Sequence, residues 1–215
     1  MCRTIVIGDI HGCFDELSDL LEKVALTADD RVVAVGDLTV KGPKSKEVLD
    51  LFAGNANLSS VIGNHDLALV KRWRGEDVSL KKTQKRARKQ LKKAGGDFYF
   101  RFLESLPFFI DLGDHVVVHA GLRPGVPLRE QTEEDLTELR TLGPDPTSRE
   151  GVPWYEEYSG PKTALFGHWP SSSPRKTHCA IGLDTGCVYG SSLTAYIIET
   201  DQFVSIKARE AYDSR

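Results

Sequence analysis

Residues 4–12 read TIVIGDIHG. Within them, Thr4–Ile7 is a β-branched run of the length of a buried strand, and a glycine follows it. Asp9 and His11 come next along the chain. In Phe14–Val24 apolar side chains recur at helical spacing. The opening therefore predicts a strand followed by a helix, with two polar side chains placed where the strand ends.

The same arrangement, a short apolar run followed by polar side chains, occurs four more times. The runs are Val32–Val35, Ser59–Ile62, Val116–Val118 and Thr163–Phe166, and they lead into Gly36-Asp37, Gly63-Asn64-His65-Asp66, His119 and Gly167-His168. A second helix is predicted at Ser45–Phe52. Strand, helix, strand, helix, strand is typical of a parallel α/β start, in which the carboxyl ends of the strands carry the site.

The carboxyl-terminal part has a different pattern. Ala180–Leu183 is another strand-like run, and residues 177–208 read as consecutive strands separated by Gly186 and Gly190. Residues 144–153 begin and end with proline and predict a surface loop. We therefore predict an α/β fold with a sheet-rich second half, organised as one domain over residues 1–215.

The polar residues at the predicted strand ends are aspartate, asparagine and histidine. Any one of them alone means little, because a strand-end aspartate more often caps a helix and a lone histidine usually makes a structural hydrogen bond. Five such strand ends in one chain are much harder to explain in that way. These ligand types suit manganese, iron or zinc, and the absence of cysteine among them argues against a structural zinc site.

Composition narrows the class of protein further. Hydrophobic residues make up 40% and charged residues 27% of the chain, as in ordinary globular proteins. A net charge of -3 argues against a protein whose whole surface binds nucleic acid. The four cysteines form no C-x-x-C pair, so we expect reduced thiols in a cytoplasmic protein. No run approaches the roughly 18 apolar residues that span a bilayer, so no membrane partner is expected.

One segment in the middle is strongly basic. Residues 71–93 contain eleven Lys or Arg and only two acidic residues, and they predict a helix that ends at Gly95-Gly96. Two interpretations are open. The segment is either a solvated helix face or an electropositive rim that attracts a polyanionic substrate or RNA.

Taken together, the strand-end motifs resemble those of the calcineurin-like metallophosphoesterases, in their phosphoprotein-phosphatase branch. Closer similarity, to symmetrical diadenosine tetraphosphatases and related bacterial-type Ser/Thr phosphatases, lies in residues 36–43, 119–122 and 182–190. The resemblance extends from residue 4 to about residue 198. It implies a calcineurin-like fold of two packed mixed β-sheets flanked by helices, with the metals at one edge.

The resemblance also implies a two-metal site. Its six ligands would be Asp9, His11, Asp37, Asn64, His119 and His168. Asp9 and His11 would hold the first divalent ion, Asp37 would bridge both ions, and the other three would complete the second site. Manganese is the expected ion, with iron, zinc, cobalt or nickel as alternatives. The ions would activate a water as hydroxide and neutralise phosphoryl oxygens.

Other residues are assigned by the same resemblance. His65 would donate a proton to the leaving group, and Asn64, Lys41 and Arg140 would contact the phosphate. Arg140 is placed on a predicted helix over Glu133–Arg140, where a surface arginine is the alternative. His115 and His178 match no motif and are expected to be structural or exposed.

The chain departs from the branch at the second motif. Val40 stands where an aspartate usually supports the proton-donating histidine, Lys41 replaces an arginine, and Ile62 replaces the arginine before Gly-Asn-His. A serine alkoxide needs strong proton donation to leave, whereas a nucleoside phosphate leaves readily. We therefore expect a preference for anhydrides over phosphoserine, and a Val40→Asp variant should shift that preference toward phosphoserine.

These inferences predict a metal-dependent hydrolase of dinucleoside polyphosphates such as diadenosine tetraphosphate, with nucleoside-capped RNA ends or polyphosphate as further substrates. A Ser/Thr protein phosphatase acting on phosphoproteins is the alternative enzyme. A binding module that has lost catalysis is a third interpretation, but such proteins typically lack metal ligands and this chain has every one. The oligomeric state is left open.

Overall fold

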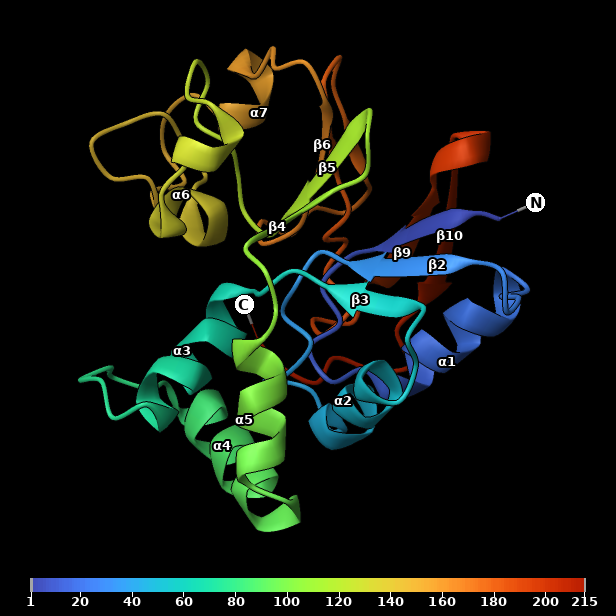
Figure 1. Cartoon of the computed structure of the whole chain (residues 1–215), viewed down its shortest axis with the longest axis vertical. Coiled ribbons are helices and arrows are strands. Elements are labelled where there is room, and N and C mark those ends of the chain that lie inside the picture. The colour runs from blue at the N-terminus through green and yellow to red at the C-terminus, as the bar shows by residue number, and fades with distance from the viewer. Residues whose placement is uncertain (1, 215) are drawn as a thin grey trace.

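The computed structural model describes residues 2–214, which form two five-stranded mixed sheets (Figure 1). The first sheet has the order β10-β9-β1-β2-β3, with β10 at Gln202–Lys207, β9 at Ser192–Ile197, β1 at Thr4–Ile7, β2 at Arg31–Ala34 and β3 at Leu58–Ser60. The second has the order β4-β5-β6-β8-β7, with β4 at Phe109–Asp111, β5 at His115–Val118, β6 at Thr163–Phe166, β8 at Ala180–Gly182 and β7 at Arg175–Lys176. This is the architecture that the sequence predicted.

Helices cover the outer face of each sheet (Figure 1). On the first sheet lie α1 (Phe14–Lys23), α2 (Ser45–Ala53), α3 (Asn64–Trp73), α4 (Lys82–Ala94) and α5 (Asp97–Glu104). The shorter α6 (Glu133–Glu138) and α7 (Trp154–Glu157) lie on the second sheet, and single 3-10 turns occur at Leu128–Glu130 and Ile198–Thr200. No helix within residues 2–214 is long and apolar enough to cross a bilayer.

The strand alternation explains these layers. In β1, Val6 points to the cluster between the two sheets, while Ile5 and Ile7 pack with the helices of the first sheet. In β6, Leu165 lies in the same inter-sheet cluster, and Phe166 packs around α7 on the outer face. Successive side chains of a strand point to opposite faces, so runs with apolar residues at every position require cover on both sides.

The pairing of the strands determines where the polar residues meet. β1, β2 and β3 are parallel to one another in the first sheet, and β5, β6 and β8 are parallel in the second. The carboxyl ends of parallel strands lie at one edge of a sheet, which is where open α/β folds place their sites. Each of the five predicted polar motifs follows one of these strands.

Residues 71–93, the basic segment, do not form the single helix that the sequence predicted. α3 ends at Trp73, residues 74–81 form a loop, and α4 begins only at Lys82. Gly75 has φ +89°, a conformation that interrupts a helix, and Leu80 is buried in the core beside the helices. The burial of this loop residue outweighs the helical pattern of the charges. The predicted end of this segment's helix at Gly95-Gly96 is confirmed, because α4 stops at Ala94.

A buried carboxylate connects β1 to the loop before β2. Asp30 is 2% exposed and accepts hydrogen bonds from three nitrogens of Arg3, at 3.1, 3.0 and 2.6 Å. It also accepts one from the backbone of Thr27 at 2.9 Å. The Arg3 guanidinium and these N–H donors hold the pKa of Asp30 well below its ordinary value.

Asp30→Asn is therefore expected to lower the free energy of unfolding by about 2 kcal/mol at neutral pH. Because the folded-state pKa lies below the unfolded one, this stabilisation is complete above about pH 4 and is lost as the pH falls. Urea unfolding at pH 7 and at low pH measures the effect. The exposed neighbour Asp29 provides the control, Asp29→Asn. An equal loss of stability at both pH values would contradict the assignment.

Candidate metal and phosphate site

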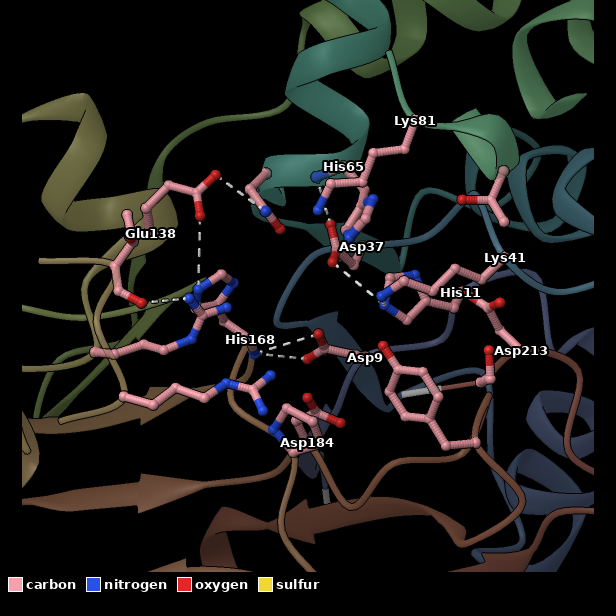
Figure 2. A pocket seen from close by; sticks show the side chains of 18 of the residues that line it. Asp9, His11, Asp37, Lys41, His65, Lys81, Glu138, His168, Asp184 and Asp213 are labelled. Carbon is pink, nitrogen blue, oxygen red and sulfur yellow. Dashed lines mark hydrogen bonds and ion pairs between the residues drawn. The ribbon is translucent and has the colours of Figure 1, made fainter. Parts of the chain in front are cut away.

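The predicted residues meet in one cavity at the carboxyl edge of the sheets (Figure 2). It has a volume of about 620 Å³, and eight of the nine predicted site residues line it: Asp9, His11, Asp37, Lys41, Asn64, His65, Arg140 and His168. The ninth, His119, is fully buried behind them, with Nε2 3.1 Å from Oδ1 of Asn64. Every residue predicted to act at the site is thus at or directly behind this cavity.

Two glycines allow the strand ends to approach one another. A Cβ at Gly63 would overlap with Oδ1 and the backbone nitrogen of Asp37, and a Cβ at Gly167 would overlap with Oδ1 of Asp9. Both glycines directly precede predicted ligands. The carboxylate of Asp37 occupies the space beside Gly63, and that of Asp9 occupies the space beside Gly167.

Three of the predicted metal ligands have a strained backbone conformation. His11, Asp37 and His168 have φ of 49°, 50° and 64°, the left-handed region that L-residues rarely adopt. Such a conformation costs about 1–3 kcal/mol per residue, and it persists where the surroundings impose it, often at functional sites. These three predicted ligands are therefore held in specific orientations at the expense of local stability.

The imidazole of His119 presents a lone pair to another acceptor. Its Nδ1 donates to the backbone oxygen of Val35 at 2.8 Å, so in the neutral ring Nε2 carries no proton. Burial lowers the pKa of His119, which favours that neutral ring. Asn64 is oriented by Glu138, because Nδ2 of the amide donates to Oε1 at 3.0 Å. Two acceptors, Nε2 of His119 and Oδ1 of Asn64, therefore face each other at 3.1 Å.

His11 is oriented in the same way. Its Nδ1 donates to the backbone oxygen of Thr39 at 3.1 Å, which leaves Nε2 as an acceptor. Nε2 lies 3.4 Å from Oδ2 of Asp37 and accepts a hydrogen bond from Nζ of Lys41 at 2.8 Å. In this arrangement the lysine ammonium is the cation that the His11 lone pair contacts.

A third imidazole has an orphaned nitrogen. Nε2 of His168 is buried and has no hydrogen-bond partner. Oε2 of Glu138 is 3.8 Å away, too far for a hydrogen bond. The backbone nitrogen of His168 donates to both carboxylate oxygens of Asp9, at 3.1 and 3.2 Å.

The surroundings of the buried carboxylates in the cavity disfavour their charged form. Burial raises the pKa of Asp37 to about 7, against the opposing effect of Lys41. Burial, together with Asp184 and Asp37, raises the pKa of Asp9, and burial also raises that of Asp184. Three buried carboxylates whose pKa values are raised despite the nearby ammonium of Lys41 are the situation in which bound cations lower the electrostatic cost.

These features fit divalent ions. At this site, two groups of side chains have ligand atoms within 4.8 Å of one another: Asp9 with Asp37 and His119, and His11 with Asp37 and His65. Asp37 belongs to both, which suits a bridging ligand. Paired lone pairs, an orphaned imidazole nitrogen and buried carboxylates are together a donor set that fits divalent metal ions.

His65 is held by its backbone and by a glutamine. Its backbone nitrogen donates to Oδ1 of Asp37 at 3.0 Å, and its Nδ1 lies 3.3 Å from Nε2 of Gln84. Burial, with the nearby charge of Lys41, lowers the pKa of His65 to about 2. The side chain points into the cavity next to Asp37 (Figure 2).

The two cationic residues among the three predicted phosphate contacts, Lys41 and Arg140, also lie in the cavity. Arg140 follows α6, which ends at Glu138 and not at Arg140 as predicted, since Leu139 turns into extended backbone. Nη1 of Arg140 donates to the backbone oxygen of Thr147 at 2.8 Å, and the side chain is half-buried, not a free surface arginine. The ammonium of Lys41 also lies 5.2 Å from the ring centre of Tyr189.

Several residues of the cavity had no predicted role. Asp184 follows β8 as Asp9 follows β1, so the same strand-end pattern could have identified it. Glu138 lies on a helix, and Asp213 comes from the carboxyl terminus, and neither has a local signal. Lys81, just before α4, lies at the cavity (Figure 2). Thr83, in the first turn of α4, also lines it.

Glu138 orients Asn64, so its removal should weaken metal binding. In Glu138→Ala the Asn64 amide loses its partner, and we expect manganese affinity to fall by about 10–100-fold. Glu138→Gln keeps an oxygen acceptor and should lose less. Competition with a chelating dye measures both, and Glu157→Ala removes the same charge from an exposed position of α7, outside the cavity lining, as the control. Unchanged affinity in both Glu138 variants would exclude this role.

Known proteins resemble this chain over its whole length. Residues 2–199 match the family model described as calcineurin-like phosphoesterase. The bis(5'-nucleosyl)-tetraphosphatase PrpE of Bacillus subtilis (strain 168), described as asymmetrical, is 31% identical over 97% of this chain and 96% of its own. A bis(5'-nucleosyl)-tetraphosphatase of Vibrio campbellii (strain ATCC BAA-1116), described as symmetrical, is 28% identical over 95% and 98%.

Solved structures agree. The crystal structure of a protein assigned provisionally as a diadenosine tetraphosphatase has a TM-score of 0.81 and 33% identity, covering 96% of this chain and 94% of that one. A protein serine/threonine phosphatase from Saccharomyces cerevisiae has a TM-score of 0.66 and 16% identity, covering 100% and 81%. The second similarity shows the fold alone.

Proposed function

Because this chain belongs to the calcineurin-like phosphoesterase family, a family of dinuclear metal enzymes, we propose that it hydrolyses a phosphoanhydride bond of dinucleoside polyphosphates. Diadenosine tetraphosphate is the substrate that represents this class. Relatives named as bis(5'-nucleosyl)-tetraphosphatases, similar over almost their full length, support the choice. Nucleoside-capped RNA ends and inorganic polyphosphate contain the same type of bond and are further substrates of the proposal.

One observation supports the metal chemistry most directly. Nε2 of His119 and Oδ1 of Asn64 face each other at 3.1 Å, and hydrogen bonds to Val35 and Glu138 determine both orientations. Two acceptors at this distance repel unless a cation lies between or beside them. Burial lowers the pKa of His119 and so disfavours the charged ring that could donate to both oxygens. A bound cation satisfies the same pair of acceptors.

The proposed ligands are those predicted, namely Asp9, His11, Asp37, Asn64, His119 and His168. Bound divalent ions would lower the pKa of a water toward neutrality and neutralise phosphoryl oxygens. Manganese is the proposed ion, with iron, zinc, cobalt or nickel as alternatives that the same donors accept. Glu138 holds the Asn64 oxygen toward the site.

The rest of the site binds and orients the phosphate chain. Arg140 and Lys41 supply the cationic donors within the cavity, and Lys81 adds a third at its rim. Nδ1 of His65 is turned to Gln84, so Nε2 faces the cavity. In the neutral ring Nε2–H can donate a hydrogen bond to the leaving oxygen. A nucleoside phosphate leaves with little proton donation, so a weak donor is sufficient for an anhydride.

The proposal is tested with metal-stripped protein, diadenosine tetraphosphate and a phosphoserine peptide, with and without manganese. We expect manganese-dependent cleavage of the dinucleotide, with the peptide nearly intact. Chromatography of the products identifies the bond that is cleaved, because ADP alone means symmetrical and AMP with ATP means asymmetrical cleavage. Efficient dephosphorylation of the peptide with the dinucleotide untouched would instead identify a protein phosphatase and overturn the proposal.

We also place this activity in the cytoplasm. The four cysteines, Cys2, Cys13, Cys179 and Cys187, are all free thiols. Free thiols are typical of reducing compartments.

A further inference from the structure

The orientation of Gln84 is determined by the backbone. Oε1 of its amide accepts a hydrogen bond from the backbone nitrogen of Lys81 at 2.8 Å, at the start of α4. Nε2 is therefore the atom that lies 3.3 Å from Nδ1 of His65. Gln84 is 6% exposed, so water competes little for either contact.

An amide nitrogen donates hydrogen bonds and accepts none. Nδ1 of His65 must therefore be the acceptor in this contact, and the single proton of the neutral ring lies on Nε2. Nδ1 faces an N–H group, so it has no place for a second proton. The ring consequently presents an Nε2–H donor to the cavity.

No other described side chain between residues 2 and 214 competes for Nδ1 of His65 by a hydrogen bond. The carboxylate of Asp66, the next residue, accepts instead from the backbone of Leu38 at 2.8 Å and from the backbone and hydroxyl of Thr39 at 3.1 and 2.5 Å. Val40 is fully buried in the apolar core. Gln84 alone therefore determines the tautomer.

We propose that Gln84 is a positioning residue that holds His65 as the Nε2–H tautomer and thereby selects substrates whose leaving group needs little proton donation. The second half of this statement rests on the proposed function. A carboxylate at the same place would accept a hydrogen bond from Nδ1–H, and the ring could then carry a proton on each nitrogen and transfer the one on Nε2 fully. An amide N–H donor at Nδ1 prevents this, which disfavours alkoxide leaving groups and leaves anhydrides accessible.

The sharpest variant is Gln84→Glu, which is nearly isosteric. One carboxylate oxygen can still accept from the Lys81 backbone, while the other replaces the N–H donor at Nδ1 with an acceptor. Gln90→Glu adds the same charge on the same helix at an exposed position and is the matched control. Gln84→Met removes the donor without adding charge and serves if the glutamate variant does not fold.

The first measurement is the ¹⁵N NMR spectrum of the histidine rings in the zinc-loaded protein, since zinc is diamagnetic. The chain has six histidines, and a His65→Asn spectrum identifies the signals of His65. We expect an unprotonated Nδ1 in the wild type and in Gln90→Glu, a protonated Nδ1 in Gln84→Glu, and a mixture of tautomers in Gln84→Met. A protonated Nδ1 in the wild type would overturn the proposal.

The second measurement is the ratio of kcat/KM for a phosphoserine peptide to kcat/KM for diadenosine tetraphosphate. Gln84→Glu should raise this ratio by about tenfold or more, and Gln90→Glu should leave it unchanged. An unchanged ratio in Gln84→Glu, with Nδ1 protonated as expected, would overturn the selection of substrates by Gln84. If the wild type cleaves no dinucleotide, the proposed function fails, and the NMR spectrum still decides whether Gln84 determines the tautomer.

Discussion

Asp37→Asn is expected to lower kcat/KM for diadenosine tetraphosphate by about 10³-fold or more, because one charge serves two proposed ions. Oδ2 of Asp37 lies 3.4 Å from Nε2 of His11 and 3.7 Å from Nε2 of His119. Oδ1 accepts a hydrogen bond from the backbone nitrogen of His65. The substitution preserves the shape of the side chain and removes the negative charge between the two histidines.

The same variant is also expected to change the stability of the metal-free protein. Burial raises the pKa of Asp37 to about 7, so the metal-free fold is destabilised by this carboxylate at and above neutral pH. Metal-free Asp37→Asn should therefore unfold at the same or a higher temperature than the metal-free wild type. Calorimetry and metal analysis separate this effect from misfolding. Retention of more than a tenth of the activity, with two ions still bound, would contradict the bridging role.

His65→Asn should have an effect that depends on the leaving group. For phosphate esters with poor leaving groups we expect a loss of about 10²-fold in kcat, and for the anhydride a loss of about tenfold or less, because the Nε2–H group of the neutral ring stabilises the leaving oxygen by a hydrogen bond. The physical reason is that a nucleoside phosphate needs little proton donation to leave. A series of aryl phosphates with leaving groups of increasing pKa measures the trend.

A metal ligand would behave differently. His65 lies in one group with His11 and Asp37, whose ligand atoms are within 4.8 Å of one another, so the series must distinguish the two roles. Loss of a ligand would reduce metal content and slow all substrates to a similar degree. The same loss for every leaving group would therefore contradict the assignment of His65 as proton donor.

The strand ends could be predicted because their signal is local. A β-branched run such as Thr4–Ile7 must be covered on both faces, and Asp9 follows it within two residues. Asp184 has the same signal after β8, but no role was predicted for it. The ligand positions were therefore visible wherever the side chain follows directly from a parallel strand.

Glu138 and Gln84 could not be predicted, because they lie on helices whose contacts depend on the packing of distant segments. Glu138 is 74 residues from Asn64, and Gln84 is 19 residues from His65. Nothing in the helical pattern around either residue indicates that its side chain contacts a polar atom of the site. The same dependence on packing explains the wrong prediction for the basic segment, where burial of Leu80 favours a loop.

The position of Val40 in the structure makes the Val40→Asp variant a poor test of substrate preference. Its side chain is fully buried among apolar residues, and its φ is 72°. Val40→Asp would bury a carboxylate in the core, so a loss of stability would obscure any change in substrate preference. Gln84 lies in contact with the imidazole, and a carboxylate there tests the same idea without entering the apolar core.

Titration of metal-stripped protein with manganese, followed at each step by bound metal per chain and by cleavage of diadenosine tetraphosphate, tests the central claim most directly. We predict two ions per chain and cleavage that appears with their binding, while Asp37→Asn binds fewer ions and remains inactive. Full activity of the metal-stripped protein in the presence of a chelator, or two bound ions without any cleavage of the dinucleotide, would contradict it.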